Sequence, residues 1–331
     1  MNMEALEEAE LCFSQLNTSC RKTMNSHWVA TLLFSLLCCI TVVIVVLNLL
    51  VIISISHFRQ LHTSTNLLLL SLAVADFLVG FLQMPSEFLL FQGCWIHGDF
   101  ICGVNYFFGY LIVSVSVGNM VLISIDRYMA ICDPMFYSTK VTLRRVQLCI
   151  CLCWIFSAVH STWILRDFLK QQHLYDFCYG ECLFVSNFAE EIVDLVVTFL
   201  GPILVIILLY LRVFVVAVSQ ARAMRSHIAA VTLQRSETVK AKRSEMKAAR
   251  TLGVVVVVFL LCSCPYYCVA IAAVNNSIWE SSAAIEIWLL YFNSCLNPVI
   301  YVFFYPWFRK SIKHIITLQI LQPGSSEASL M

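Results

Sequence analysis

Seven long apolar stretches follow one another along the chain. The first lies between Lys22 and Arg59, where the sequence has no Lys, Arg, Asp or Glu. Six more follow, at about 66–91, 100–131, 146–165, 192–218, 251–274 and 283–304. A helix needs about 20 predominantly apolar residues to cross a bilayer, so each stretch predicts a membrane-spanning helix. The predicted fold class is an all-α membrane protein with a seven-transmembrane helix bundle.

The composition agrees with this fold class and argues against two other classes of protein. Apolar residues make up 60% of the 331 residues, charged residues only 12%, and the formal net charge is +1. Soluble domains carry about 25% charged residues. The high apolar fraction argues against a disordered chain, and the near-zero charge argues against binding to nucleic acid.

Lys and Arg are distributed unequally over the connections between the spans. Seventeen of them lie on the side of the C-terminus, and only Arg21, Lys22, Arg166 and Lys170 lie on the other side. Because basic residues collect on the cytoplasmic side of a membrane, the N-terminus is predicted to be extracellular. The outer segments instead carry twelve carboxylates. This acidic rim either attracts cations or simply follows from the topology.

The two ends and one long connection complete the predicted organisation. Residues 1–27 form an extracellular N-terminal tail, 28–304 the seven-helix domain, and 305–331 a short amphipathic helix and a short cytoplasmic tail. The sequence Pro323-Gly324-Ser325-Ser326 predicts that this tail is frayed. The connection at about 212–250 carries nine Lys or Arg residues, which favour docking of a cytosolic partner or attraction to anionic membrane lipids.

The sixteen cysteines divide into two groups by their predicted position. Six lie outside, in an oxidising compartment, which predicts up to three disulfides among Cys12, Cys20, Cys94, Cys102, Cys178 and Cys182. The other ten lie in or below the membrane and are interpreted as apolar packing residues rather than metal ligands. Asn17-Thr18-Ser19 is a glycosylation sequon in the predicted outer tail, with Asn17 as the acceptor.

A charged residue inside the second span predicts a polar network. Asp76 lies in the middle of the second span, with Asn48, Asn293 and Asn297 as polar residues in the first and seventh spans. These residues form either a hydrogen-bonded network between helices or a site for a small cation.

The sequence Asp126-Arg127-Tyr128 stands at the inner end of the third span. Arg127 either extends its charge to the membrane surface or forms a breakable ion pair with Glu245, at the start of the sixth span. The second alternative predicts a switch between two helices.

Asp194 in the fifth span is the most informative single residue. Glu190, Asp194 and Thr198 recur every four residues and share one helix face. A buried carboxylate must be protonated or find a cation, and the outer half-spans contain no Lys or Arg. Asp194 is therefore expected either to bind a cationic ligand or to be a protonated, hydrogen-bonded acid.

Aromatic residues at the same depth favour a small protonated amine as the ligand. They are Tyr110, Tyr266, Tyr267, Trp288 and Tyr291. Cation–π contacts suit an ammonium group, although each residue alone is compatible with ordinary helix packing. Glu286 and Glu190 are candidates for a second amine contact, and Glu286 alternatively lines the way into the site.

Residues in all seven spans resemble the rhodopsin-like G-protein-coupled receptors. The matching residues are Asn48, Ala75-Asp76, Cys102, Asp126-Arg127-Tyr128, Trp154, Pro202, Tyr210, Phe259, Cys264-Pro265 and Asn297-Pro298-Val299-Ile300-Tyr301. Within this family, the segment from Asn293 to Phe308, the segment from Cys178 to Cys182 and the segment from Cys12 to Cys20 are similar to trace-amine-associated receptors.

The resemblance implies several features of structure and signalling. It implies the bridges Cys12–Cys178, Cys20–Cys94 and Cys102–Cys182. It assigns the coupling switch to Asp126, Arg127, Tyr128, Glu245, Tyr210 and Tyr301, with Arg127 engaging the G protein. It also implies a stimulatory G protein, raised cyclic AMP and expression in olfactory neurons, and it makes Asp76, Ser116 and Asn293 a candidate sodium site. No other cofactor is expected.

The chain departs from the family pattern at two positions that matter for function. Gly109 stands where amine receptors place the aspartate that binds the ammonium, and Asp194 resembles the alternative carboxylate of one branch of trace-amine-associated receptors. Ser263 replaces the tryptophan usually found two residues before the proline of the sixth span, so rotation of a tryptophan cannot trigger activation.

The sequence thus predicts a plasma-membrane receptor for small protonated amines, and the resemblance implies a location in olfactory neuron cilia. Asp194, Thr198, Tyr110, Tyr266, Tyr267, Trp288 and Tyr291 are the expected ligand-binding residues. The alternatives are an olfactory receptor for a non-amine ligand and, less favoured, a membrane transporter. No nucleophile with a neighbouring base is found in the outer part of the chain, so an enzyme is not expected.

Overall fold

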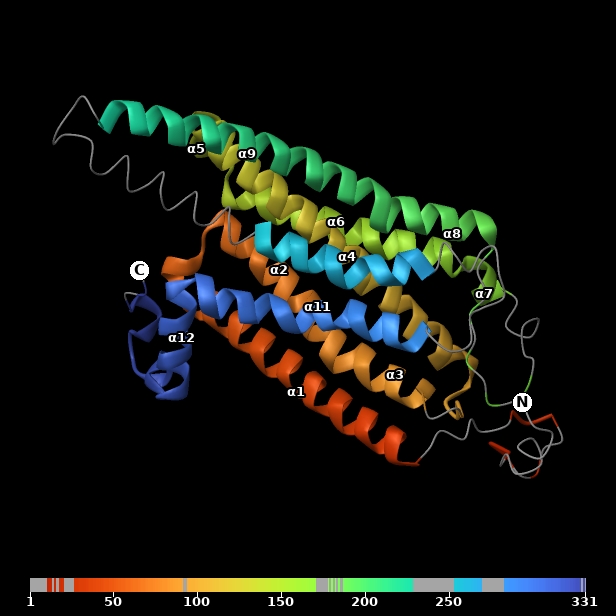
Figure 1. Cartoon of the computed structure of the whole chain (residues 1–331). Coiled ribbons are helices and arrows are strands. Elements are labelled where there is room, and N and C mark those ends of the chain that lie inside the picture. Colours follow the sequence, from red (N-terminus) through yellow and green to blue (C-terminus); the bar gives the residue numbers. More distant parts are fainter. Residues whose placement is uncertain are drawn as a thin grey trace.

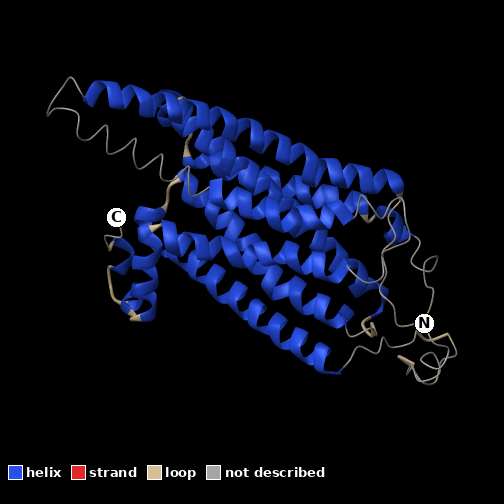
Figure 2. Cartoon of the chain, in the orientation of Figure 1, coloured by secondary structure: helices blue, strands red, loops and turns tan. Residues whose placement is uncertain are grey.

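The computed structural model of the chain describes residues 11–13, 15, 18–20, 27–91, 94–170, 178, 180, 182, 184, 187–228, 253–269, 283–328 and 330. This part consists of helices joined by loops (Figure 2). The long helices run alongside one another as an elongated bundle (Figure 1). The N-terminus lies at one end, here called the outer end, and the C-terminus lies at the other, the inner end (Figure 1).

The described helices confirm the predicted all-α bundle. Five of them are long and apolar enough to cross a membrane, and Gly253–Val269 and Leu289–Phe304 are shorter apolar helices. The long elements are α1 (His27–His57), α2 (Ser64–Leu78), α3 (Met84–Phe91), α4 (Gly98–Cys132), α6 (Leu143–Ile164), α8 (Phe188–Leu195), α9 (Gly201–Ile228) and α11 (Ala283–Phe304). The second span comprises α2 and α3, and the fifth comprises α8 and α9.

Two of the spans contain a π-helical turn close to a proline. The turn η3 (Val79–Gln83) lies just before Pro85 in the second span, and η4 (Val196–Leu200) lies just before Pro202 in the fifth. Proline lacks an N–H group and cannot complete the regular hydrogen-bond ladder, so the backbone adjusts locally. Each turn changes which side chains of the outer half-span face the bundle.

Packing between the helices combines apolar clusters with a few polar contacts. The largest cluster lies toward the inner end and contains Phe58, Leu69, Met120, Tyr301 and Phe308, each 2% exposed or less. Lipid tails are as apolar as these side chains, so close packing and hydrogen bonds between helices hold such a bundle together.

Short elements close the inner end of the bundle. They are α5 (Pro134–Lys140), α12 (Pro306–Ile316) and the 3-10 turns η2 (Arg59–Leu61), η5 (Gln319–Leu321) and η6 (Ser325–Glu327). Helix α12 turns away from α11 across the inner end (Figure 1) and buries Trp307 and Phe308. This confirms the amphipathic helix that was predicted after the seventh span.

The C-terminal tail is packed, so the prediction of a frayed end is wrong. Ser325 Oγ lies 3.0 Å from His57 Nε2, and the backbone N–H of Leu330 donates to Gln60 Oε1 at 3.2 Å. The Leu330 side chain is fully buried in the cluster that contains Phe58. The Pro-Gly-Ser-Ser sequence makes tight turns that fold the chain back, rather than a loose end.

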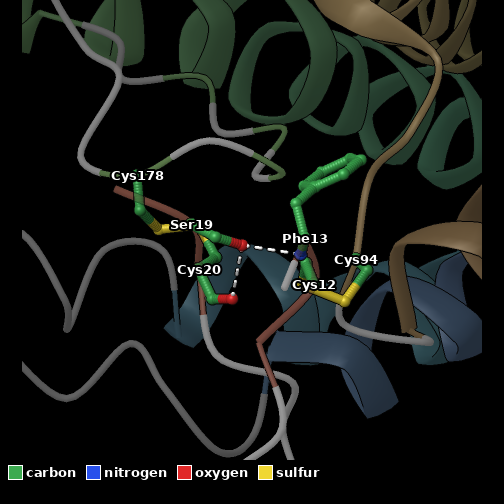
Figure 3. The surroundings of a disulfide bond; sticks show 6 residues. All are labelled: Cys12, Phe13, Ser19, Cys20, Cys94 and Cys178. Atoms are coloured by element: carbon green, nitrogen blue, oxygen red, sulfur yellow. Dashed lines mark hydrogen bonds between the residues drawn. A yellow bond between two sulfur atoms is a disulfide. The ribbon is translucent and has the colours of Figure 1, made fainter. Parts of the chain in front are cut away.

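Three disulfides form at the outer end, but two of the pairings implied by the family resemblance are wrong. Cys102–Cys182 is as expected, whereas Cys12 pairs with Cys94 and Cys20 pairs with Cys178 (Figure 3).

The physical reason is that Cys12, Cys20, Cys94 and Cys178 all lie close together at the outer end. The Cys12 N–H donates to the Cys20 carbonyl at 2.9 Å, so the two strands of the N-terminal segment lie side by side. The Trp95 N–H donates to the Gly180 carbonyl at 2.8 Å and brings the other two cysteines near. The alignment of these backbone segments decides which cysteines pair, and the spacing of the cysteines along the sequence does not reveal that alignment.

We expect peptide mapping of the purified, non-reduced protein to recover Cys12 linked to Cys94 and Cys20 linked to Cys178. Replacing Cys12→Ser should leave the Cys94 thiol open to alkylation, because its partner is gone. The measurement is mass spectrometry after alkylation and proteolysis, with the Cys102–Cys182 peptide as the internal control. Recovery of Cys20 linked to Cys94 would contradict the structure.

Candidate functional site

Asp194 lies near the end of α8, in the outer half of the fifth span. The helix begins with a capping box, in which Asn187 and Glu190 each accept a hydrogen bond from the other's backbone N–H at 3.0 Å. The Asp194 side chain is only 18% exposed. Its Oδ1 atom is buried and accepts no hydrogen bond within the described residues. Asp194 is thus a buried acceptor without a matching donor.

His160 is the partner of Asp194 that the sequence analysis missed. Its Nε2 atom, on α6, lies 3.7 Å from Asp194 Oδ1, which is too long for a hydrogen bond. The His160 side chain is 5% exposed, and neither ring nitrogen has a hydrogen-bond partner in the described part of the chain. A histidine in the otherwise apolar fourth span is the sequence signal for this partner, because His, like Lys and Arg, can carry a positive charge.

Thr198 connects Asp194 to the sixth span. Its hydroxyl donates to the Asp194 carbonyl at 2.6 Å, one helical turn away. Its oxygen also lies 2.8 Å from the Tyr267 hydroxyl, which is then the donor of that bond. The Tyr267 ring stacks on Phe199 with 4.2 Å between centroids. The fifth and sixth spans are therefore joined beside the free carboxylate.

Four predicted tyrosines converge on this region and are here called the tyrosine cluster: Tyr110, Tyr266, Tyr267 and Tyr291. The first three lie within electrostatic range of Asp194, and Tyr291 lies within range of Tyr266. Tyr266 and Tyr267 pack edge to face with 5.1 Å between centroids. Rings from the third and sixth spans thus lie near the carboxylate, and the seventh span adds Tyr291 on the side of Tyr266.

A second polar group lies next to Gly109 and was also missed. A Cβ atom added to Gly109 would lie 3.3 Å from Gln83 Nε2, so the Gln83 side chain occupies the space beside this glycine. Gln83 Nε2 donates to Glu87 Oε1 at 3.0 Å and lies 3.3 Å from Asn105 Oδ1. Glu87 was counted only as part of the acidic rim, although its spacing of four residues from Gln83 places both on one helix face.

Glu190 already serves the helix and the loop before it. Its side chain is 2% exposed, and Oε2 accepts the Asn187 N–H, as described above. Its other oxygen lies 3.8 Å from Arg166 Nε. Oε1 is buried and accepts no hydrogen bond within the described residues, so a second amine contact at Glu190 stays a prediction.

The inner end of the third span holds a closed polar network around Arg127. Arg127 Nε and Nη2 lie 3.0 and 2.5 Å from Asp126 Oδ2, and Nη2 also contacts Thr65 Oγ1. Thr65 donates to Asp126 Oδ2 at 2.9 Å, and the Tyr137 hydroxyl donates to Oδ1 at 3.0 Å. Burial and the adjacent Asp126 carboxylate raise the pKa of Tyr137, which keeps its phenol protonated as a donor. Arg127, only 7% exposed, is held inside the bundle.

Comparisons with known proteins identify the family. The model of the 7 transmembrane receptor (rhodopsin family) matches residues 47–301. Trace amine-associated receptor 13c of Danio rerio is 34% identical, over 100% of this chain and 98% of that protein. Trace amine-associated receptor 9 of Rattus norvegicus is 38% identical, over 97% of each. This chain belongs to the trace amine-associated receptors of the rhodopsin family. It is a multi-pass membrane receptor whose partner is a G protein, and not an enzyme.

The receptor has a third polar network around Asp76. Its two carboxylate oxygens accept hydrogen bonds of 2.8 Å from Ser294 and Asn297, and Asn48 Nδ2 donates to the Ser294 carbonyl at 3.0 Å. The predicted Asn297 is thus confirmed as a partner of Asp76, Asn48 is connected to the network through Ser294, and Ser294 itself was missed. Asn293 Oδ1 is buried and accepts no hydrogen bond within the described chain.

Some predicted residues of the receptor lie outside the described part. Glu245 and Asn17 are among them, as are the side chains of Glu286 and Trp288. Of the other switch residues, Tyr210 on α9 lies within electrostatic range of Arg127. The Tyr301 hydroxyl on α11 is buried with no hydrogen-bond partner in the described part of the receptor.

Removing the charge that holds Arg127 should raise signalling without ligand. We expect Asp126→Asn to increase basal nucleotide exchange on the G protein, by about tenfold for each 1.4 kcal/mol lost from the closed state. Tyr137→Phe, which removes one neutral donor, should have a smaller effect. The measurement is nucleotide exchange in membranes, normalised to receptor number.

The matched control is Glu327→Gln, which removes a carboxylate at the inner end whose side chain is 71% exposed. It should leave basal exchange unchanged. Equal basal exchange in Asp126→Asn and the wild type would show that this network does not restrain the receptor.

Proposed function

We propose that the receptor detects small protonated amines, with Asp194 as the partner of the ammonium group. The observation that carries the proposal is the buried, unpartnered Asp194 Oδ1 within the tyrosine cluster. The relatives named above are trace amine-associated receptors, which supports an amine as the ligand. The absence of a side chain at Gly109 removes the alternative carboxylate on the third span.

An ammonium group fits the chemistry of this site. A carboxylate in a low-dielectric interior is costly without a partner, and a bound cation removes that cost. Hydrogen bonds between an ammonium and a carboxylate are shorter and stronger than neutral ones. Aromatic rings add cation–π attraction of about 0.5–2 kcal/mol each. Every one of these contributions is specific for a positive charge.

His160 has a supporting role in this proposal. In its neutral form, the imidazole is a donor that can orient Asp194 without neutralising it. At 3.7 Å it leaves Oδ1 open to a stronger donor. The amine would then complete a group of three: imidazole, carboxylate and ammonium.

Binding at Asp194 can reach the inner end through the sixth span. The Thr198–Tyr267 contact joins that span to the residue next to the ammonium site. A ligand shifts a receptor toward the state that it binds better, so contraction of this region would favour outward movement of the inner half of the sixth span. Ser263 stands where the family usually has the tryptophan whose rotation accompanies activation. Its hydroxyl is buried and has no hydrogen-bond partner among the described residues. In this receptor, the Thr198–Tyr267 contact would instead couple ligand binding to movement of the sixth span.

We further propose a stimulatory G protein, raised cyclic AMP and a location in the plasma membrane of olfactory cilia. The basic connection at 212–250 supports docking of an acidic cytosolic surface and contact with anionic membrane lipids. Release of Arg127 from Asp126 would provide the new contact for the G protein.

A sodium ion held by Asp76, Ser116 and Asn293 is part of the same proposal. The residues fit the ion, because Asn293 Oδ1 is a buried oxygen without a donor and Ser116 is 9% exposed. Carboxylate, amide and hydroxyl oxygens are the ligands that hard cations prefer. The ion would supply positive charge to a buried carboxylate whose two hydrogen-bond donors are neutral.

Sodium should stabilise the purified receptor. We expect a higher melting temperature in sodium chloride than in N-methylglucamine chloride, since an ion that binds only the folded state stabilises it. Asp76→Asn should abolish this difference and Asn293→Ala should reduce it. The readout is thermal unfolding of detergent-solubilised receptor. The same melting temperature in both salts would refute the proposed ion site.

The central test is a panel of amines with a cyclic AMP readout. Asp194→Ala should lower the potency of every active amine by about 100-fold or more, because breaking a buried charge pair costs about 3–5 kcal/mol. Adding Gly109→Asp to Asp194→Ala should restore part of the response to some amines, through a new carboxylate that displaces Gln83.

Asp99→Asn is the matched control, because Asp99 lies in the first turn of α4 at the outer end. Its loss should change potency little, and surface expression of each variant is measured in parallel. Unchanged potency of all active amines in Asp194→Ala would overturn the proposed function.

A further inference from the structure

Glu87 is a second carboxylate beside the tyrosine cluster that the proposed function does not use. It lies on α3, between the rim and the Gln83 amide that contacts it at 3.0 Å. The Tyr291 hydroxyl on α11 also interacts with the Glu87 carboxylate. Its described partners are neutral: no Lys, Arg or His in that part of the chain forms an ion pair with it.

The amide next to Glu87 has an unused acceptor. Gln83 is 2% exposed, and its Oε1 accepts no hydrogen bond in the described residues. Its Nε2 already donates to Glu87 and Asn105, so the direction of the amide is set by these two bonds. A Cβ on Gly109 would lie 3.3 Å from Nε2 and 3.7 Å from Oε1, so the amide group as a whole lies beside the third span. A buried acceptor without a donor costs about 1–3 kcal/mol, which a donor from a ligand would recover.

Tyr266 places Glu87 and Asp194 around the same group of rings. Both carboxylates act on the Tyr266 hydroxyl electrostatically, as does Glu191 on α8, and Glu87 also acts on Tyr291. Asp194 comes from the fifth span and Glu87 from the second, so they approach the tyrosine cluster from different helices. The cluster thus has a carboxylate from each of two separate spans.

We propose that Glu87 and Gln83 Oε1 form a second ammonium site, so that the receptor prefers diamines. One ammonium group would pair with Asp194 and the other with Glu87, while the hydrocarbon chain between them lies against the tyrosine rings. Gln83 Oε1 accepts the remaining N–H of the second ammonium. This inference rests on the proposed function, because it needs Asp194 to hold the first ammonium.

A purely structural role for Glu87 predicts something different. Gln83 and Glu87 are four residues apart on one helix face, and such pairs stabilise helices by only about 0.2–0.5 kcal/mol. In that case, replacing Glu87 would change expression or the potency of all ligands alike. A second ammonium site instead predicts an effect on diamines alone.

The experiment compares straight-chain α,ω-diamines of increasing length with the monoamines of the same chain lengths. Cyclic AMP is measured for the wild type, Glu87→Gln, Asp194→Asn and the control Asp99→Asn, at matched surface expression. Glu87→Gln keeps the size and the hydrogen-bonding capacity of the side chain while removing its charge. Gln83→Leu tests the amide acceptor in the same way.

We expect one range of diamine lengths to be about tenfold or more stronger than the matched monoamines, as for a partly buried charge pair. Glu87→Gln should remove this advantage and leave monoamine potency within about twofold, the scatter expected for a neutral replacement. Gln83→Leu should reduce the advantage in the same direction. Asp99→Asn should keep it, which separates a local site from general attraction by the acidic rim.

Two kinds of failure are distinguishable. If monoamines activate through Asp194 but diamines have no advantage, or if Glu87→Gln weakens both classes equally, the second site is overturned and the proposed function stands. If neither class activates the surface-expressed wild type, the proposed function fails and the diamine site fails with it.

Discussion

A carboxylate buried among membrane helices needs a compensating donor or cation, and this requirement organises the whole receptor. The Asp126 carboxylate accepts hydrogen bonds of 3.0 Å or less from Arg127, Thr65 and Tyr137. Asp76 has two neutral donors at 2.8 Å. Within the described residues, Asp194 Oδ1 accepts no hydrogen bond and lies 3.7 Å from the His160 imidazole. The three acids therefore differ in how fully hydrogen bonds and charge satisfy them: Asp126 most, Asp76 next and Asp194 least.

These acids also divide the work along the length of the bundle. The outer half brings together rings and acceptors from the second, third, fifth, sixth and seventh spans, while the inner half is filled by close apolar packing. The Thr198–Tyr267 contact joins the fifth and sixth spans beside the outer carboxylate.

The sequence was sufficient for the features that one strong physical rule dictates. Bilayer thickness sets the length of the spans, and the cost of a buried charge singles out Asp194 and Arg127. It was insufficient where several arrangements have similar cost. His160 and Glu87 were missed because their importance depends on how far the π-helical turns and neighbouring spans rotate each helix. The exchange of Cys12 and Cys20 between partners depends on backbone register within a short loop.

The packed C-terminal tail has a consequence for the cooperativity of the fold. Ser325 and Leu330 attach the last turns to His57 and Gln60, at the junction that follows the first helix. Leu330 is also buried in the cluster that contains Phe58 and Phe308. Detaching the tail would expose part of that cluster, so the base of the first helix and the C-terminal tail unfold locally as one unit. Amide hydrogen exchange at the base of the first helix thus reports on residues more than 250 positions later in the sequence.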